Sequence, residues 1–241
     1  MIFNKIRNYR SLILEMFAIF IGISASFWVD DYRTQLDERA LVNKYLNGFI
    51  RDLENDTVAL EQLLEVRMNQ KASAKAILLI MESNTLDIDK FYANYFYLFP
   101  FYRFIPNSNT IEELLNSSHL RLVSDEALKS GILELRSMYK NIQLSEEHVY
   151  HDRLSYFYSE FTMDKVELQG LFLAADNASF ASSKDSEIYR QDAENFMSDR
   201  YFKNFLTLLI YNMEFQIPQL EEARDECKLL IEMMNEQLGN R

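Results

Sequence analysis

Few side chains in this sequence stand at spacings that could perform chemistry. His148 and His151 lie one helical turn apart, with Glu147 and Asp152 beside them. A His-x-x-His pair could supply two metal ligands, but zinc-binding catalytic helices use His-Glu-x-x-His spacing. We therefore interpret the pair as part of a polar helix face, with metal binding as the alternative, and expect no metal.

The other reactive side chains stand alone. His119 follows a short polar run, and we expect it to lie in a turn rather than act as an acid–base catalyst. Cys227 is the only cysteine, so no disulfide forms within the chain. The sequence has no glycine-rich phosphate loop, no Gly-x-Ser-x-Gly and no Cys-x-x-Cys. We expect no catalytic residues, no cofactor and no enzyme activity; the alternative is an unrecognised site between helices.

The remaining unusual group is Glu15, the one charge in the apolar stretch 11–29. That stretch is about as long as a membrane-spanning helix requires. A cleavable signal has a shorter apolar core and a small-residue cleavage site, whereas this stretch ends in Phe-Trp-Val-Asp-Asp. A buried soluble helix would be amphipathic. We therefore predict a retained transmembrane helix, preceded by a basic segment, residues 1–10.

One face of this helix carries small residues. Ala18, Gly22 and Ser26 recur every four residues, a pattern that lets helix backbones approach closely in lipid. Glu15 lies two turns from Gly22 on the same face. It either reaches the headgroups, lines a bundle of identical helices, or relays protons or ions. We predict self-association of the transmembrane helix through these four residues.

Composition limits the class of protein further. The 241-residue chain has a formal net charge of −12, which argues against binding of nucleic acid and against broad adhesion to anionic lipid. Only 5 Gly and 3 Pro occur, which favours long helices over a β-rich architecture. We predict an all-α fold in which the transmembrane helix continues into a long helix and an antiparallel helical bundle.

The predicted soluble domain covers 30–241. Apolar residues recur at three- and four-residue spacing along a long helix at 31–82, although Asp56 and Arg67 fall on the same seam and favour packing inside a bundle over a coiled coil. The further predicted helices are 110–117, 125–161 and 199–238.

Cap and breaker residues set the limits of these helices. Thr110 and Glu113 form a capping box, and Ser124 starts the next helix. Pro218 should kink or split the last helix, and Gly239 is a plausible cap at its end. The Ser-rich run 179–186 predicts a surface loop.

Aromatic residues crowd the segment 87–106, which Pro100 and Pro106 interrupt. Three interpretations stay open: packing in a core or subunit interface, a groove for a ligand or protein partner, and contact with the membrane. The candidate contact surface consists of Tyr92, Tyr95, Phe96, Phe99 and Tyr102.

Three motifs of the first 56 residues resemble an uncharacterised bacterial membrane-anchor family. They are Glu15-x6-Gly22-Ile23, then Asp30-Asp31-Tyr32-x-x-Gln35, then Tyr45-Leu46-x4-Arg51-Asp52-Leu53-Glu54-Asn55-Asp56. Members of that family typically read Gly-Glu, Ile-Gly-Ile, Asn-Asn-Trp-Asn-Glu, Tyr-Leu and Leu-x-x-Asp-Leu. The later run 112–120 is similar to the family's Leu-x-Ser-Gly-x-Leu segment. Here Leu14 replaces the Gly, and Asp30, Asp31 and Tyr32 replace Asn-Asn-Trp.

The resemblance implies an anchored helical protein in the bacterial inner membrane and transfers no catalytic residue. Lys and Arg are slightly more frequent before the apolar stretch than after it, which favours a cytoplasmic amino terminus. Two function classes stay open. One is a non-enzymatic interaction protein or scaffold, homo-oligomeric or an accessory subunit of a membrane complex. The other is an oligomeric pore gated by the helical domain, with Glu15 lining the path.

Overall fold

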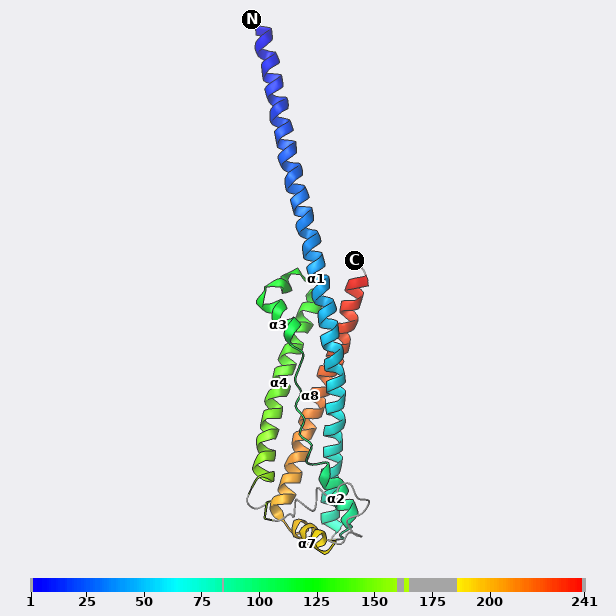
Figure 1. Ribbon diagram of the computed structural model, residues 1–241. Helices are drawn as coiled ribbons and strands as arrows, with labels where there is room; N and C mark the ends of the chain where they lie inside the picture. Colours follow the sequence, from blue (N-terminus) through cyan, green and yellow to red (C-terminus); the bar gives the residue numbers. More distant parts are fainter. Residues whose placement is uncertain (1, 84, 160–162, 165–185, 240–241) are drawn as a thin grey trace.

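The computed structural model describes residues 2–83, 85–159, 163–164 and 186–239, and the side chains of this part from Leu12 onward. The described residues form helices and connecting segments, without a strand (Figure 1), so the predicted all-α class is confirmed. The elements in chain order are α1 (Ile2–Ser83), α2 (Ile88–Phe96), α3 (Asn109–Asn116), the 3-10 helix η1 (His119–Leu122), α4 (Glu126–Phe157), α7 (Ser186–Met197) and α8 (Arg200–Gly239).

Helix α1 is one uninterrupted helix of 82 residues, about 120 Å long at 1.5 Å per residue. Its amino-terminal part projects alone from the domain (Figure 1). Burial begins at Leu41 and Val42, where the helix enters the bundle. The predicted long helix 31–82 is therefore the second half of a longer element that already begins at Ile2.

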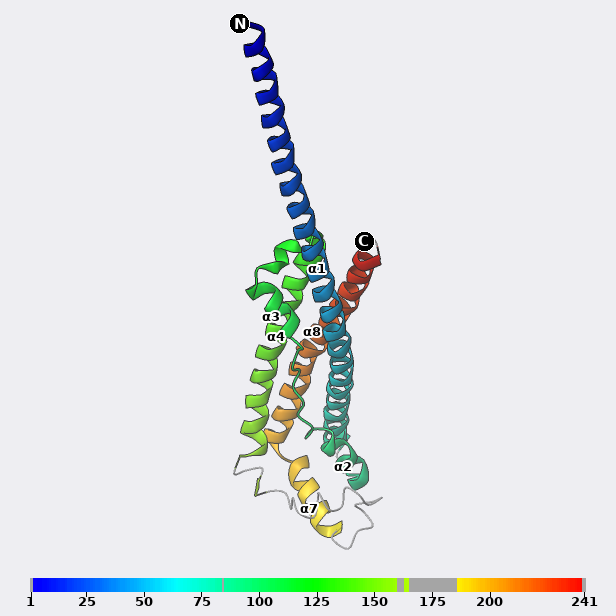
Figure 2. The same ribbon diagram turned by 45° about the horizontal axis from the view of Figure 1, so that its top comes forward.

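Three long helices build the domain. The chain runs down α1, returns along the segment between α2 and α3, runs down α4 and then up α8, which packs against both α1 and α4 (Figures 1 and 2). All five apolar seam residues predicted for the long helix are buried: Leu46, Phe49, Leu53, Leu60 and Leu63. The core has an upper cluster near α3 and a lower, aromatic cluster near α2 and α7.

Helices α4 and α8 approach closely at Gly131. A Cβ atom at this position would lie 2.7 Å from Leu230 Cδ2 and 2.9 Å from Glu226 Oε1. Only glycine fits there without movement of the facing side chains, because these distances lie far inside van der Waals contact. This glycine in the helix interior therefore sets the spacing between the two helices.

Two predicted helix starts are corrected. Asp125, rather than Ser124, caps α4, and its carboxylate accepts hydrogen bonds from the Ala127 and Leu128 amides. The capping box at Thr110 is wrong. Helix α3 begins one residue earlier, after Ser108, and the Glu113 carboxylate accepts a hydrogen bond from the Tyr45 hydroxyl instead.

Helix α8 is not split at Pro218. Proline removes one backbone hydrogen bond, but Gln216 and Leu220 on either side are buried in the bundle, and this packing holds the helix together. Helix α7 was not predicted. Its signal is Tyr189, Ala193 and Phe196, an apolar stripe that is buried here. The predicted loop 179–186 lies outside the described residues except at Ser186, where α7 begins.

Candidate functional site

The predicted membrane residues lie on the projecting part of α1. Every described side chain from Leu12 to Asp37 is exposed, including Glu15, Ala18, Gly22 and Ser26. The Ser26 hydroxyl donates to the Gly22 carbonyl at 2.9 Å, so its polar group is satisfied within the helix. Among the described helices, α1 alone is long and apolar enough to cross a membrane.

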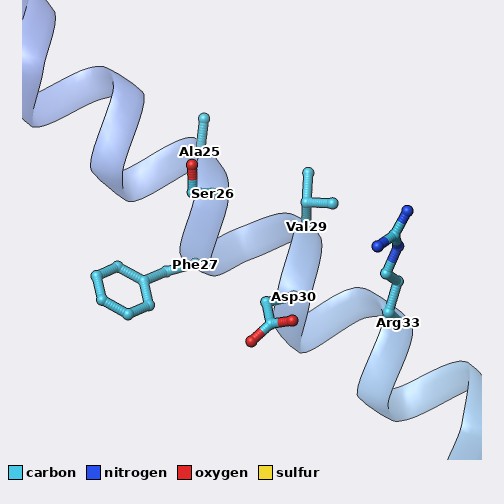
Figure 3. Close-up of a pocket in the computed structure, with 6 residues that line it drawn as sticks. All are labelled: Ala25, Ser26, Phe27, Val29, Asp30 and Arg33. Atoms are coloured by element: carbon cyan, nitrogen blue, oxygen red, sulfur yellow. The ribbon is translucent and has the colours of Figure 1, made fainter.

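The apolar stretch ends abruptly at Val29 and Asp30. Figure 3 shows the shallow hollow at this boundary, whose lining residues all come from α1 and extend from the helix in different directions. No second element faces them, so the hollow is open surface rather than a ligand site. The rings of Trp28 and Tyr32 stack beside it, with centroids 6.1 Å apart.

The densest polar contacts lie elsewhere, along the connecting segment 97–108. This segment, which we call the strap, runs back along the bundle between α1 and α4 (Figures 1 and 2). Buried side chains of both helices bind its backbone. From α1, Gln70 Nε2 donates to the Pro100 carbonyl at 2.6 Å and Arg67 Nη2 to the Tyr102 carbonyl at 2.8 Å.

Helix α4 holds the same strap with opposite charges. Glu146 Oε2 accepts a hydrogen bond from the Phe104 amide at 2.9 Å. Two turns further along α4, Arg153 Nη2 donates to the carbonyls of Leu98 and Phe99. An extended segment inside a bundle cannot pair its backbone with itself, so these side chains replace the missing hydrogen bonds.

Arg67 and Glu146 also bind each other, with Arg67 Nη2 and Glu146 Oε1 3.2 Å apart. Burial lowers the pKa of Arg67 and raises the pKa of Glu146, because desolvation outweighs their mutual attraction. Burial and the nearby Arg67 charge lower the pKa of Arg153 to about 10. The Phe101 ring lies within 6 Å of both guanidinium groups, close enough for cation–π attraction.

A second polar cluster surrounds Asp56 on α1. Its Oδ1 accepts hydrogen bonds from the backbone and side-chain amides of Asn107 at 2.9 and 2.7 Å, which fixes the other end of the strap. Its Oδ2 accepts a hydrogen bond from the Tyr139 hydroxyl at 2.8 Å, and that hydroxyl contacts Cys227 Sγ at 3.1 Å. Burial raises the pKa of Asp56, and burial raises the pKa of Cys227 to about 11.

The side chains of both clusters stabilise the fold. Asp56, Tyr139 and Cys227 are buried, and the Cys227 thiol keeps its proton at neutral pH, so the group is a poor nucleophile. Within the described residues, the hydrogen bonds of Arg67, Glu146 and Arg153 go to one another, to Gln70 of α1 or to the strap. The clusters fix the strap between α1 and α4 and present no reactive atom to a substrate.

Sequence reasoning identified two of the four buried charged residues in these clusters. Asp56 and Arg67 stood out as charges on an apolar seam. Glu146 and Arg153 were missed, although the same signal was present. The buried positions of α4 continue at three- and four-residue spacing through both charges: Leu135, Tyr139, Ile142, Glu146, Val149, Arg153 and Tyr156.

The histidines lie away from these clusters. His148 and His151 are exposed on α4 and pair with Asp152 and Glu147, at 3.6 and 3.0 Å. Within the described residues, no group of three or more potential ligands could hold a metal ion. His119 lies in η1, where its Nδ1 is 3.0 Å from the Tyr45 hydroxyl.

The predicted aromatic contact surface is wrong for Tyr92 and Tyr95. Both are buried, because the aromatic rings of α2 pack against Phe196 of α7 and Phe202 of α8 and form the lower core. The Tyr92 hydroxyl donates to the Tyr189 carbonyl at 2.9 Å. Phe96 and Phe99 are partly buried against that core, and Tyr102 on the strap is exposed. This aromatic end lies opposite the projecting part of α1 (Figure 1).

Comparison with known proteins adds no relative. No protein-family model, curated protein or solved structure matches this chain.

Proposed function

We propose that this chain is a membrane-anchored, non-enzymatic interaction protein of the bacterial inner membrane. Residues 11–29 cross the bilayer, and the helical domain serves as a scaffold or accessory subunit. The amino terminus faces the cytoplasm and the domain the opposite side. The observation that supports this proposal most strongly is the exposure of the apolar stretch on α1 at every position from Leu12 to Val29.

Exposure of so much apolar surface is unfavourable in water. Each square ångström of apolar surface costs about 25 cal/mol when it is left in water, and large exposed apolar patches mark membrane or protein contacts. Elsewhere the domain buries its apolar residues in two clusters. A bilayer accounts for the length of the stretch, and the stacked Trp28 and Tyr32 suit its interface.

The continuity of α1 supports a scaffold. Residues 30–40, all exposed except the partly buried Glu38, separate the apolar stretch from the bundle, or about 16 Å of helix. Because α1 has no break there, it sets the domain at a defined height above the lipid. The buried polar side chains bind the protein's own backbone, which fits a rigid body better than a catalytic one.

Membrane fractionation tests the proposal. The full chain is expressed in bacteria, and the membranes are washed with alkaline carbonate and with urea. We expect the chain to stay in the pellet until detergent is added, while a variant with Ile19→Arg and Phe20→Arg moves to the supernatant. A wild-type chain in the supernatant, or a mature protein that begins beyond Tyr32, would contradict the proposal.

Protection from protease tests the orientation. Protease added outside intact spheroplasts should digest the helical domain, and permeabilised cells are the control. A domain that is cut only after permeabilisation lies on the cytoplasmic side.

A gated pore is the second candidate, because Glu15 lies on the same side of the apolar stretch as Gly22. In proteoliposomes, Glu15→Gln should then abolish ion flux and leave assembly intact. A parent protein without flux, whose Gly22→Leu variant loses self-association, favours the scaffold.

A further inference from the structure

Helix α8 carries a second apolar stripe outside the core. Leu208, Phe215 and Leu229 stand at multiples of seven residues and are 42%, 54% and 49% exposed. Tyr211 lies beside the stripe, and its ring contacts the Phe215 ring with centroids 4.7 Å apart. Other residues of α8 already supply the contribution of this helix to the two core clusters. An outward stripe at seven-residue spacing is typical of a helix that packs against a further helix.

This stripe borders α4. Tyr201 lies on the same spacing, seven residues before Leu208, and its hydroxyl donates to the Ser155 carbonyl of α4 at 3.5 Å. Asn212, four residues after Leu208, donates to Asp152 of α4 at 3.1 Å. Residues four or seven apart lie on the same side of a helix. The stripe therefore follows the side of α8 that packs against α4 (Figures 1 and 2).

Carboxylates stand along the same border. Glu222 continues the seven-residue spacing of the stripe, and Glu226 follows one turn later with its carboxylate against Gly131 of α4. Burial and the nearby Glu134 carboxylate of α4 raise the pKa of Glu226, so two like charges meet across the two helices. Asp152 lies five turns after Glu134 on the same side of α4.

Ion pairs bridge the other helix junctions. Glu214 of α8 pairs with Lys71 of α1 at 3.4 Å, and Arg136 of α4 pairs with Glu112 of α3 at 2.9 Å. Along the border of α4 and α8, no described lysine or arginine pairs with the four carboxylates, and only one of them has a histidine partner, at 3.6 Å. The negative charge of this border is therefore uncompensated by the described residues.

The stripe and the carboxylates form one surface, which we call the α4/α8 face. Its apolar members are Leu208, Tyr211, Phe215 and Leu229, and its acidic members are the four carboxylates, each exposed or partly buried. Lys140 and Arg200 are the basic residues that flank it most closely by helix position. Carboxylates outnumber cations even when both are counted, so the face suits a basic partner and repels another acidic surface.

We propose that the α4/α8 face binds an amphipathic helix of another protein, one whose apolar stripe is flanked by lysine or arginine. This inference names the partner chemistry of the interaction role proposed above and rests on that role. The stripe of the partner helix packs on the apolar members of the face, and its cations meet the carboxylates. Leu208 and Leu229 are about 32 Å apart along α8, so a partner helix of about 20 residues covers the face.

Two synthetic peptides test the charge preference. Each is a helix of about 20 residues built from leucine, alanine and one charged residue, lysine in the first and glutamate in the second. Fluorescence anisotropy measures their binding to the full chain in micelles of an uncharged detergent, with protein-free micelles as the baseline. We expect the lysine peptide to bind at least about tenfold more tightly, and its affinity to fall with added salt. Equal affinities, or no binding above the baseline, would overturn the proposal.

Charge reversal on the face gives a second test. Glu222→Lys with Glu226→Lys should weaken the lysine peptide by about tenfold or more. The matched control is Glu65→Lys with Glu82→Lys, which changes the net charge equally at two exposed positions of α1 and should leave the affinity within about twofold. The same loss in both variants would contradict a site on this face.

Truncation of one apolar member completes the test. Phe215→Ala should weaken the lysine peptide by about tenfold, whereas Leu79→Ala, at a leucine of α1 that is 66% exposed, should leave it unchanged. Light scattering of the same samples checks for a second copy as the occupant. A face variant that loses self-association while it keeps peptide binding would assign the face to a second copy and overturn the proposal.

Carbonate extraction separates this inference from the anchorage, because binding in micelles does not require a bilayer. An anchored chain that fails to distinguish the two peptides contradicts the α4/α8 face alone. A chain that distinguishes the peptides but is extracted from membranes contradicts the anchorage alone.

Discussion

Arg67 of α1 and Glu146 of α4 meet inside the bundle, with Nη2 and Oε1 3.2 Å apart and both side chains buried. The same Arg67 nitrogen donates to the Tyr102 carbonyl, and the other Glu146 oxygen accepts a hydrogen bond from the Phe104 amide. One ion pair therefore joins two helices and the strap between them. The stability of the domain should depend on this junction more than on any exposed ion pair.

Arg67→Met should destabilise the domain by about 3–5 kcal/mol, because it leaves a buried carboxylate without its charged partner. The loss should shrink as the pH falls, since protonation of Glu146 removes the unpaired charge. Urea unfolding of the full chain in detergent, followed by circular dichroism, measures both effects. Lys228→Met breaks the exposed pair with Glu61 and should cost less than about 1 kcal/mol. Equal losses in the two variants would contradict the role of the junction.

Acidification should stabilise the folded domain through Asp56. Burial raises the pKa of Asp56 despite its hydrogen bonds, so the folded chain binds this proton more tightly than the unfolded chain, where Asp titrates near pH 3.9. The corresponding stability is fully present below that ordinary value and is lost as the pH rises through the raised value.

Unfolding free energies measured at a series of pH values test this sign. Asp56→Asn should flatten the gain on acidification. The exposed Glu61 is the control with the opposite sign, because its bond to Lys228 lowers its pKa. A wild-type domain that loses stability as the pH falls toward the ordinary Asp pKa, or an Asp56→Asn variant with the same pH dependence as the wild type, would show that Asp56 does not govern this dependence.

Tyr139→Phe should cost about 1.5–3 kcal/mol, since it removes a hydrogen bond to the buried carboxylate of Asp56. The pKa of Asp56 should rise further, so the pH dependence should begin at a higher pH. Tyr211→Phe is the matched control. The Tyr211 ring is exposed, and its substitution should change stability by less than about 0.5 kcal/mol. Thermal melts of the two variants side by side decide the comparison.

Gly131→Ala should cost about 1–3 kcal/mol, because its Cβ would overlap Leu230 Cδ2 and force α4 away from α8. Gly48→Ala is the control, because its nearest neighbour is Thr110 at 3.4 Å, an ordinary contact. That second change should be neutral or slightly stabilising, since alanine is the better helix former. A Gly131→Ala domain with unchanged unfolding would contradict the close approach of the two helices.

Several features could be predicted from local patterns in the sequence. The apolar seam of α1, the all-α class and the approximate limits of α4 and α8 follow from residue spacing and from the scarcity of glycine and proline. The candidate membrane residues Glu15, Ala18, Gly22 and Ser26 were also visible. Their roles in a membrane remain predictions, whereas their exposure is a property of the fold.

Other features depend on long-range contacts. Tyr92 and Tyr95 belong to the core because residues of α7 and α8 pack over them. No pattern within 87–106 predicts that these two helices pack there. Pro218 stays inside a helix because packing on both sides outweighs one missing hydrogen bond. Glu146 and Arg153 were visible as charges on a seam, but their partners are backbone groups of the strap, which lie some forty to fifty-five residues away in the chain.

The sequence by itself determined where the chain is helical and which stretch is apolar enough to enter a bilayer, because helix periodicity and hydropathy are properties of neighbouring residues. Only the tertiary structure decided which charges are buried, which aromatic residues are covered, and that the strap lies between α1 and α4. Those outcomes depend on contacts between residues far apart in the chain, where burial and hydrogen bonding act together.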